Sequence, residues 1–277
     1  MQGRPPIAAL RPFVTQLWAT DTTASPGAVG RERVLPTGAV HIAVRLSGAP
    51  LRTLAHERDL IGREHAPAVI GGPRMQPYLR RTGEPCASVG AMLRPGAAEF
   101  LVGAPAEAFV DQHCALIDLW GDEATVLRQR LVEQPTAAAR LRVFEAALME
   151  RLARPSKASV RAPRGLHPAV AHALGRFATA PVGVGTVVDE LGLSHRRFVS
   201  LFRRTVGLPP KHHCRVLRFR RMLPLAADPQ LPWVDAALRG GYADQPHLSR
   251  EFRALAGMRP SEYRARAPRW TGHVPLD

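Results

Sequence analysis

The feature that most constrains the fold of this chain is an internal repeat in its C-terminal half. Residues separated by an offset of 50 match in type. The matching pairs are Ser194 with Asp244, Phe198 with Leu248, Phe202 with Phe252, Arg203 with Arg253, Gly207 with Gly257, Pro210 with Pro260, and His213 with Tyr263. Because a repeated pattern of this kind marks one supersecondary unit used twice, the C-terminal half is expected to hold two copies of one small structure.

Each copy carries the start and stop signals of a helix. A capping residue, Ser194 or Asp244, is followed by apolar residues four and eight positions later, which fall on one helix face. A glycine then closes the helix and a proline starts the next one. Pro246 falls in the first turn after Asp244, where no backbone hydrogen bond is lost. Residues 187–192 and 236–241, just upstream, each indicate a short helix ended by a glycine turn, so the pattern predicts two helix-turn-helix units.

A basic segment joins the two copies. Residues 210–223 are expected to form a helix of about 14 residues, which spans about 21 Å at 1.5 Å per residue. Such a connector could hold two reading helices near one turn of DNA, or roughly 34 Å, apart. Lys211, Arg215 and Arg218 on it are candidate phosphate contacts.

The net charge follows the same division of the chain. Of the 277 residues, those at 1–150 carry 16 basic and 15 acidic side chains, whereas those at 151–277 carry 22 basic and 8 acidic ones. Nearly all of the formal net charge of +15 therefore lies in the second half, which favours a polyanionic partner for that half. A basic surface that is merely solvated is the alternative.

The faces opposite the apolar residues of the two capped helices are polar and basic. Arg can pair with the guanine edge and Gln with the adenine edge in the major groove, whereas any single Arg could instead contact phosphate or water. With the connector included, the candidate DNA-binding residues are His195, Arg196, Val199, Ser200, Arg203, Lys211, Arg215, Arg218, Gln245, His247, Ser249, Arg250 and Arg253.

The first hundred residues indicate strands and turns. Short apolar runs at 40–46, 68–70 and 87–93 are bounded by Gly and Pro, which is typical of a small sandwich or barrel. Helices are expected at 97–101, 123–133 and 137–152. The apolar stripe of the last one, Leu141, Phe144, Leu148 and Leu152, fits either a helix packed on its own sheet or a dimer helix.

Several classes of protein are disfavoured. No apolar run is long enough to span a membrane, and the N-terminus lacks the apolar core of a signal peptide. Cys86, Cys114 and Cys214 are odd in number and far apart, so they fit a reducing cytoplasm; burial or redox sensing are the two roles open to Cys86 and Cys114. No common catalytic or cofactor motif is present, so neither catalytic residues nor a cofactor are expected.

Residues 184–266 resemble the DNA-binding domain of the AraC/XylS family of bacterial transcription regulators. The resemblance rests on Gly241-Tyr-Ala-Asp-Gln-Pro-His-Leu-Ser-Arg-Glu-Phe252, on Gly257-Met-Arg-Pro-Ser-Glu-Tyr-Arg264, and on Leu191-Gly-Leu-Ser-His-Arg-Arg-Phe198 of the first copy. Membership implies a seven-helix domain whose two reading helices enter the major groove. Carried over by position, the base-reading candidates are Arg196, Val199, Ser200, Gln245, His247, Ser249 and Arg250. One departure is Pro224, which predicts that the connecting helix ends a turn early.

The resemblance also implies a β-rich, cupin-like N-terminal domain that senses a ligand or dimerises. A cupin metal site is disfavoured, because His41, His56, His65 and His113 lack the close spacing with a carboxylate that such a site needs. The expected fold is thus multidomain, with an N-terminal α+β domain (a β-rich cupin-like sandwich or barrel followed by helices) at 1–153. A linker at 154–166 then leads to an all-α domain with two helix-turn-helix units at 167–268.

These features predict a cytoplasmic, sequence-specific transcription regulator that is not an enzyme. Its expected partners are double-stranded promoter DNA, a small-molecule effector, a second copy of the chain in a homodimer and, if it is an activator, RNA polymerase; no membrane partner is expected. The alternatives are a sequence-independent, nucleoid-type DNA binder and a DNA-repair enzyme fused to a helix-turn-helix domain. The operator sequence and the identity of the effector stay open.

Overall fold

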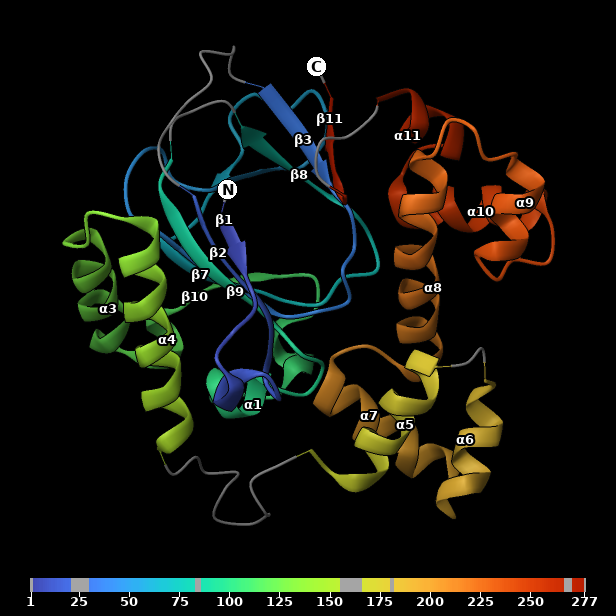
Figure 1. The fold of residues 1–277 in the computed structure, drawn as a ribbon, viewed down its shortest axis with the longest axis horizontal. Helices are drawn as coiled ribbons and strands as arrows, with labels where there is room; N and C mark the ends of the chain where they lie inside the picture. The colour runs from blue at the N-terminus through green and yellow to red at the C-terminus, as the bar shows by residue number, and fades with distance from the viewer. Residues whose placement is uncertain are drawn as a thin grey trace.

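The computed structural model describes residues 2–20, 30–82, 86–154, 166–179, 182–266 and 271–276. Figure 1 shows a β-rich part built from the first half of the chain beside a helical part built from the second half. This is the multidomain architecture that the sequence predicts. Residues 155–165, which hold nearly all of the expected linker, lie outside the described residues.

Two antiparallel sheets form the β-rich part. Within the described residues, the strand order of the first sheet is β1 (Gln2–Arg4), β2 (Val14–Thr20), β9 (Ser88–Leu93), β4 (His41–Arg45), β7 (Ala68–Gly71) and β10 (His113–Ala115). The order of the second is β11 (His273–Pro275), β3 (Gly30–Val34), β8 (Tyr78–Thr82), β5 (Arg52–Leu54) and β6 (Arg63–Glu64). The apolar runs that predict strands form β4, β7 and β9, which are neighbours in the first sheet.

Helices cover one face of the first sheet. Ile42 of β4 lies opposite Ile70 of β7 and Ala91 of β9, so these three buried side chains share that face. The helices and 3-10 turns of the β-rich part are η1 (Ala8–Leu10), α1 (Ala98–Leu101), η2 (Ala106–Phe109), α2 (Ile117–Trp120), α3 (Asp122–Val132) and α4 (Ala137–Ala153). They bury their apolar sides in one cluster with that face.

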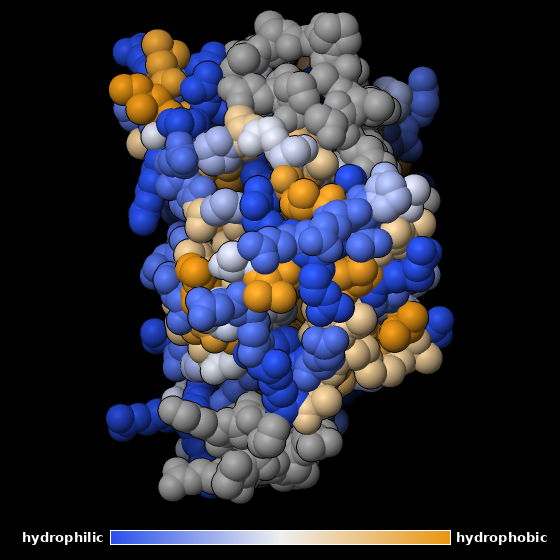
Figure 2. All heavy atoms as spheres, turned by 90° about the vertical axis from the view of Figure 1, so that its left-hand side faces the viewer, coloured by the Kyte–Doolittle hydropathy of each residue, from blue (hydrophilic) through white to orange (hydrophobic). Residues whose placement is uncertain are grey.

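The apolar stripe of α4 belongs to this cluster. Phe144 and Leu148 are fully buried there, so the stripe packs on the chain's own sheet, the first of the two interpretations above. The outer face of α3 and α4 is shown in Figure 2, where apolar residues are scattered among polar ones.

The described helical part has the seven helices that the family resemblance implies. They are α5 (Pro168–Thr179), α6 (Val184–Leu191), α7 (His195–Val206), α8 (Pro210–Ala227), α9 (Trp233–Arg239), α10 (Gln245–Ala256) and α11 (Pro260–Arg266). One apolar cluster holds α5 to α7 together around Phe198 and Phe202. A second holds most of α8 with α9 to α11 around Phe219 and Phe252. The repeat therefore corresponds to two small cores joined by α8.

The prediction that the connecting helix stops early at Pro224 is wrong, because α8 continues through it to Ala227. An internal proline costs about 3 kcal/mol. Beyond it, Ala226 is fully buried in the second core, and Arg264 of α11 donates a hydrogen bond to the Ala226 carbonyl at 3.0 Å. Packing of the last turn outweighs the local penalty. The helix has 18 residues and is about 27 Å long.

The end of the chain returns to the β-rich part. Strand β11 pairs with β3, with His273 opposite Val34. Val274, the middle residue of β11, is fully buried in the apolar cluster of the second helix-turn-helix unit, where Leu35 of the β-rich part also lies. No signal in the sequence predicts this strand. It connects the second unit to the second sheet.

The structure describes the surroundings of the three cysteines and the character of the helices. Cys86, Cys114 and Cys214 are part-buried free thiols, and burial raises the pKa of Cys114 above its ordinary value. A raised pKa disfavours the reactive thiolate. Among the described helices, none combines the length and apolar character needed to cross a bilayer.

Candidate nucleic-acid interface

The start of α10 is fixed by its first residues. The Oδ1 of Asp244 accepts a hydrogen bond from the backbone N–H of His247 at 2.6 Å, as an N-cap does. Pro246 lies in the first turn, as expected. Leu248 and Phe252 are fully buried against the second core. The opposite side of the helix is thereby turned to solvent from its first residue.

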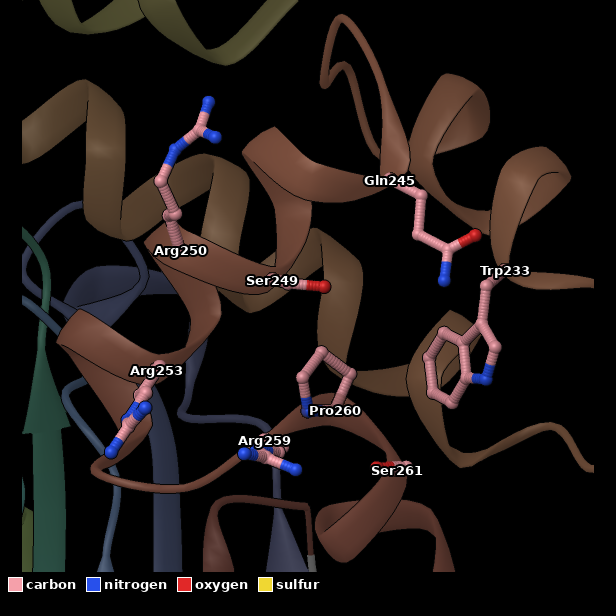
Figure 3. Close-up of a pocket in the computed structure, with 8 residues that line it drawn as sticks. All are labelled: Trp233, Gln245, Ser249, Arg250, Arg253, Arg259, Pro260 and Ser261. Carbon is pink, nitrogen blue, oxygen red and sulfur yellow. The ribbon is translucent and has the colours of Figure 1, made fainter.

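That outward side lines a shallow depression. Its lining residues, drawn in Figure 3, are Trp233, Gln245, Ser249, Arg250, Arg253, Arg259, Pro260 and Ser261. Three of them are exposed arginines and none is a carboxylate. The side chains therefore present mainly hydrogen-bond donors, together with the amide of Gln245. Such a surface suits an anionic partner with exposed acceptors.

The structure thus brings together four of the residues named from the sequence, Gln245, Ser249, Arg250 and Arg253. It adds Trp233 and Arg259, which the sequence reasoning misses. Arg259 lies just before Pro260 at the start of α11, so its position beside α10 depends on the turn between the two helices. Its position in a basic segment next to a helix start is a signal that could have found it.

Two of the predicted phosphate contacts hold α8 against α10. Arg215 donates to both carboxylate oxygens of Glu251 at 2.9 Å, and Arg218 lies 3.9 Å from the same carboxylate. Arg218 also stacks over the ring of Tyr242, 5.1 Å from its centroid. Burial by itself would raise the pKa of Glu251, but the hydrogen bond and charge of Arg215, together with Arg218, keep that pKa below its ordinary value. The charge of Arg215 is therefore largely compensated within the protein, and that of Arg218 only in part.

His247 is also engaged, whereas Lys211 is free to reach outward. The His247 ring packs edge-on against Tyr242, with 5.4 Å between centroids, and its Nδ1 accepts from the Ala243 N–H at 3.3 Å. This ring therefore holds the start of α10 in place. Lys211 is exposed near the start of α8.

Helix α7 has the same local design in different surroundings. Ser194 caps it by accepting from the Arg197 N–H at 3.4 Å. His195, Arg196 and Ser200 are exposed, and Val199 is half-buried. At the offset of 50, Ser200 is short where α10 has Arg250, whereas His195 stands where α10 has Gln245. The two helices therefore differ most at the position of Arg250.

The last turn of α7 lies against the β-rich part. Helix α7 packs on η2, and a side chain at Gly207 would have its Cβ 2.4 Å from a ring carbon of Pro73. Arg203 lies 3.7 Å from Glu107, and Arg204 lies 3.8 Å from Glu99. Arg203 and Arg253 are equivalent in the repeat, yet only Arg203 has a carboxylate partner among the described residues.

Two family models match different parts of the chain. Residues 187–266 match a family model described as a helix-turn-helix domain, and residues 2–115 match a domain of unknown function (DUF6597). No curated protein matches the chain closely enough to count as a relative.

Solved structures similar to the chain include several regulators. One is a probable AraC family transcriptional regulator from Rhodopseudomonas palustris, at 25% identity over 36% of this chain and 98% of that one, with a TM-score of 0.32. Another is the C-terminal domain of AraT, a response regulator from Geobacillus stearothermophilus, at 24% identity over 36% and 86%, with a TM-score of 0.33. A third is ToxT from Vibrio cholerae, at 9% identity over 90% and 98%, with a TM-score of 0.44.

Proposed function

We propose that the chain, whose residues 187–266 match a helix-turn-helix family model, is a transcription regulator of the AraC family and that α10 is its main sequence-reading helix. The observation that carries the proposal is the outward side of α10, where Gln245, Ser249 and Arg250 project beside one another and no carboxylate lines the surface. Donors of this kind suit the acceptor atoms that guanine and adenine present in the major groove.

The side chains of α10 divide by chemistry. Arg250 is suited to the O6 and N7 of guanine, and Gln245 to the N6 and N7 of adenine. Ser249 can bond to either kind of edge. Arg253 and Arg259 flank them and suit phosphates, which position the helix without reading sequence. His247 acts through its contact with Tyr242 and orients the N-terminal turn of α10.

The first unit contributes in a different way. His195, Arg196, Val199 and Ser200 on α7 face outward and provide weaker base contacts. Arg203 and Lys211 add charge near the DNA backbone. Helix α8, about 27 Å long, joins the two units and is somewhat shorter than the roughly 34 Å of one DNA turn. Arg215 and Arg218 act on this spacing from within, by fixing α8 to α10 through Glu251.

The remaining roles follow from this assignment. The protein acts in the cytoplasm on promoter DNA and performs no catalytic step. Its β-rich domain senses a small effector, pairs with a second copy of the chain, or does both; RNA polymerase is a further partner if the protein activates transcription. The β-rich domain is in direct contact with both helix-turn-helix units, which supports a regulatory link between them.

The test is selection of bound sequences from random double-stranded DNA by the full-length chain. The proposal expects an enriched site and an affinity at least about 1,000-fold above that for random DNA at physiological salt. A ratio near one would instead support the sequence-independent, nucleoid-type binder. Arg142→Ala, at an exposed position on α4 distant in sequence from α10, is the matched control and should leave the ratio unchanged.

A further inference from the structure

Polar side chains of the two sheets meet between them. Most buried apolar residues of the β-rich part gather in a cluster between the first sheet and the helices, and that cluster takes no member from β3, β5 or β8, although Val34 of β3 and Leu54 of β5 are buried. Packed sheets normally share an apolar core between their inner faces. Here the inner faces carry histidines, arginines and a tyrosine.

The strand register brings two of the histidines together. His41 of β4 and His113 of β10 both lie opposite Gly71 of β7, so all three positions are on the same face of the first sheet. A Cβ at Gly71 would be 2.0 Å from the His41 ring. Glycine is therefore required there, and it lets the two imidazoles approach to 5.9 Å between centroids.

Side chains of the second sheet complete the group. The ring of Tyr78 on β8 lies 4.9 Å from that of His113, and the ring of His65 lies 5.1 Å from it. His65 is held in turn by Thr53, whose hydroxyl is 2.8 Å from its Nε2. Together with Arg74 and Arg80 these residues form the inter-sheet polar cluster, defined as His41, His65, Arg74, Tyr78, Arg80 and His113. Each member is only part-buried, so each keeps some surface in contact with solvent.

Positive charge dominates the cluster. Glu32 of β3 forms an ion pair with Arg80 and is also bonded to His273 of β11 at 2.9 Å. Arg74 has no carboxylate partner among the described residues. Burial and the charges of Arg74 and Arg80 lower the pKa of His41 to about 4, and burial, His41 and Arg74 lower that of His113 to about 2. Both imidazoles are therefore neutral at neutral pH, chiefly because burial disfavours the charged form and, to a lesser extent, because the site already holds positive charge.

Two donors in the cluster have no acceptor. Arg74 donates from Nη2 to the Nδ1 of His113 at 3.0 Å and from Nη1 to the Asp111 carbonyl at 2.7 Å. Since Arg only donates, His113 accepts at Nδ1 and carries its proton on Nε2. That Nε2 and the Nε of Arg74 are both buried without a hydrogen-bond partner within the described residues. Buried donors left unpaired are costly, so two of them on side chains that contact each other indicate a missing acceptor.

We propose that the inter-sheet polar cluster binds a small organic acid, whose carboxylate accepts hydrogen bonds from Arg74 and His113. A carboxylate offers two acceptor oxygens and one negative charge, which meets both orphaned donors and the excess positive charge. The carbon skeleton would lie along the same face of the first sheet, where Trp18 and Met92 are part-buried. The role of this acid as an effector rests on the proposed function, whereas its binding to the cluster does not depend on DNA recognition.

A metal cation fits the cluster less well. The Nδ1 of His113 is already occupied by Arg74, and two guanidinium groups would repel a cation. The described residues contain no group of His, Cys, Asp or Glu arranged to hold a metal ion. The anion is therefore the occupant that the observations favour.

The test is calorimetric titration of the full-length protein with benzoate, hexanoate, succinate, citrate, inorganic phosphate and zinc chloride. We expect saturable binding of at least one carboxylate. Arg74→Gln and His113→Phe should each weaken it at least about ten-fold, the effect of losing one charge-assisted hydrogen bond. Arg52→Gln is the control, because Arg52 pairs with Glu64 at the sheet edge outside the cluster, and it should bind as the wild type does.

Four results would overturn the proposal. These are the absence of carboxylate binding, equal binding by Arg74→Gln, binding of phosphate alone, or saturable zinc binding that His113→Phe abolishes. Circular dichroism selects the folded variants, and His113→Gln replaces His113→Phe if the latter does not fold. Promoter binding is measured on the same samples: Arg250→Ala should lose its preference for one guanine yet keep carboxylate binding, so failure of this proposal is distinguishable from failure of the proposed function.

Discussion

The two helix-turn-helix units share a local design and differ in their neighbours. Helices α7 and α10 both start at a side-chain cap, bury a phenylalanine eight residues later and end at a glycine with positive φ. The outward side of α10 carries Gln245 and Arg250. The last turn of α7 lies against η2, with Arg203 near Glu107. The comparison teaches that the repeat sets the internal structure of each unit, whereas surface residues and contacts with the β-rich part set what each unit can do.

The largest expected effect tests the shared internal structure. Phe202 and Phe252 are both fully buried, Phe202 beside Phe177 and Phe198, and Phe252 beside Phe219 and Tyr263. Phe202→Ala and Phe252→Ala should each cost about 3–5 kcal/mol, because each leaves a cavity in its own core. Chemical denaturation measures the loss. A cost below 1 kcal/mol for either variant would show that the two cores are not equivalent.

The second effect is a dependence of stability on pH that arises in the first unit and not at the equivalent position of the second. His213 in the first unit occupies the place of Tyr263 in the second, and burial lowers its pKa to about 4 from an ordinary 6.5. The unfolded chain therefore binds a proton at pH 4 to 6.5 that the folded chain does not. Stability is fully present above pH 6.5 and should fall by roughly 1.4 kcal/mol for each pH unit as the pH drops through that window.

Unfolding measured between pH 7 and 4 checks this expectation. His213→Tyr, which installs the residue of the second unit, should remove that part of the pH dependence. An unchanged pH profile in His213→Tyr would contradict the assignment of the acid sensitivity to this side chain.

How far the sequence predicts the molecule can be seen from particular residues. Caps such as Ser194 and Asp244, and the apolar runs that form β4, β7 and β9, are local signals, so the sequence reveals them. The continuation of α8 past Pro224 depends on packing of Ala226 against distant residues. The pairing of β11 with β3 depends on a strand of three residues, which is too short to show a pattern.

The candidate site divides in the same way. The outward positions of Gln245, Ser249, Arg250 and Arg253 follow from helix periodicity, which the sequence contains. The inward pairing of Arg215 with Glu251 requires the position of α10 relative to α8, which periodicity does not give. The sequence does not predict the inter-sheet polar cluster for the same reason, because the cluster depends on the register of His41 and His113 against Gly71.

The third effect compares the equivalent arginines of the two units. Arg253→Ala should weaken promoter binding several-fold and reduce the slope of log affinity against log salt by about 0.9, as expected for one lost phosphate contact. Arg203→Ala should change both less, because Glu107 already offsets the charge of Arg203. Binding measured over a salt series compares them. Equal slopes for the two variants would show that the contact with the β-rich part does not distinguish the units.

The smallest expected effect concerns the contact between the first unit and the β-rich part. Glu107→Gln removes the carboxylate near Arg203, and because exposed ion pairs contribute about 0–1 kcal/mol, DNA affinity should rise by roughly two-fold. Glu133→Gln, at an exposed position just after α3, is the control and should leave affinity unchanged. A fall in affinity in Glu107→Gln would mean that the contact supports the DNA-binding arrangement.

The most direct test of the central claim, that α10 reads the DNA sequence, is a base-by-base specificity profile of Arg250→Ala and Ser200→Ala on the selected site. Position 200 is the equivalent of position 250 in the first unit. Arg250→Ala should lose about 1–3 kcal/mol of preference for one guanine and keep its preferences elsewhere, whereas Ser200→Ala should change little. A profile for Arg250→Ala identical to that of the wild type would contradict the claim.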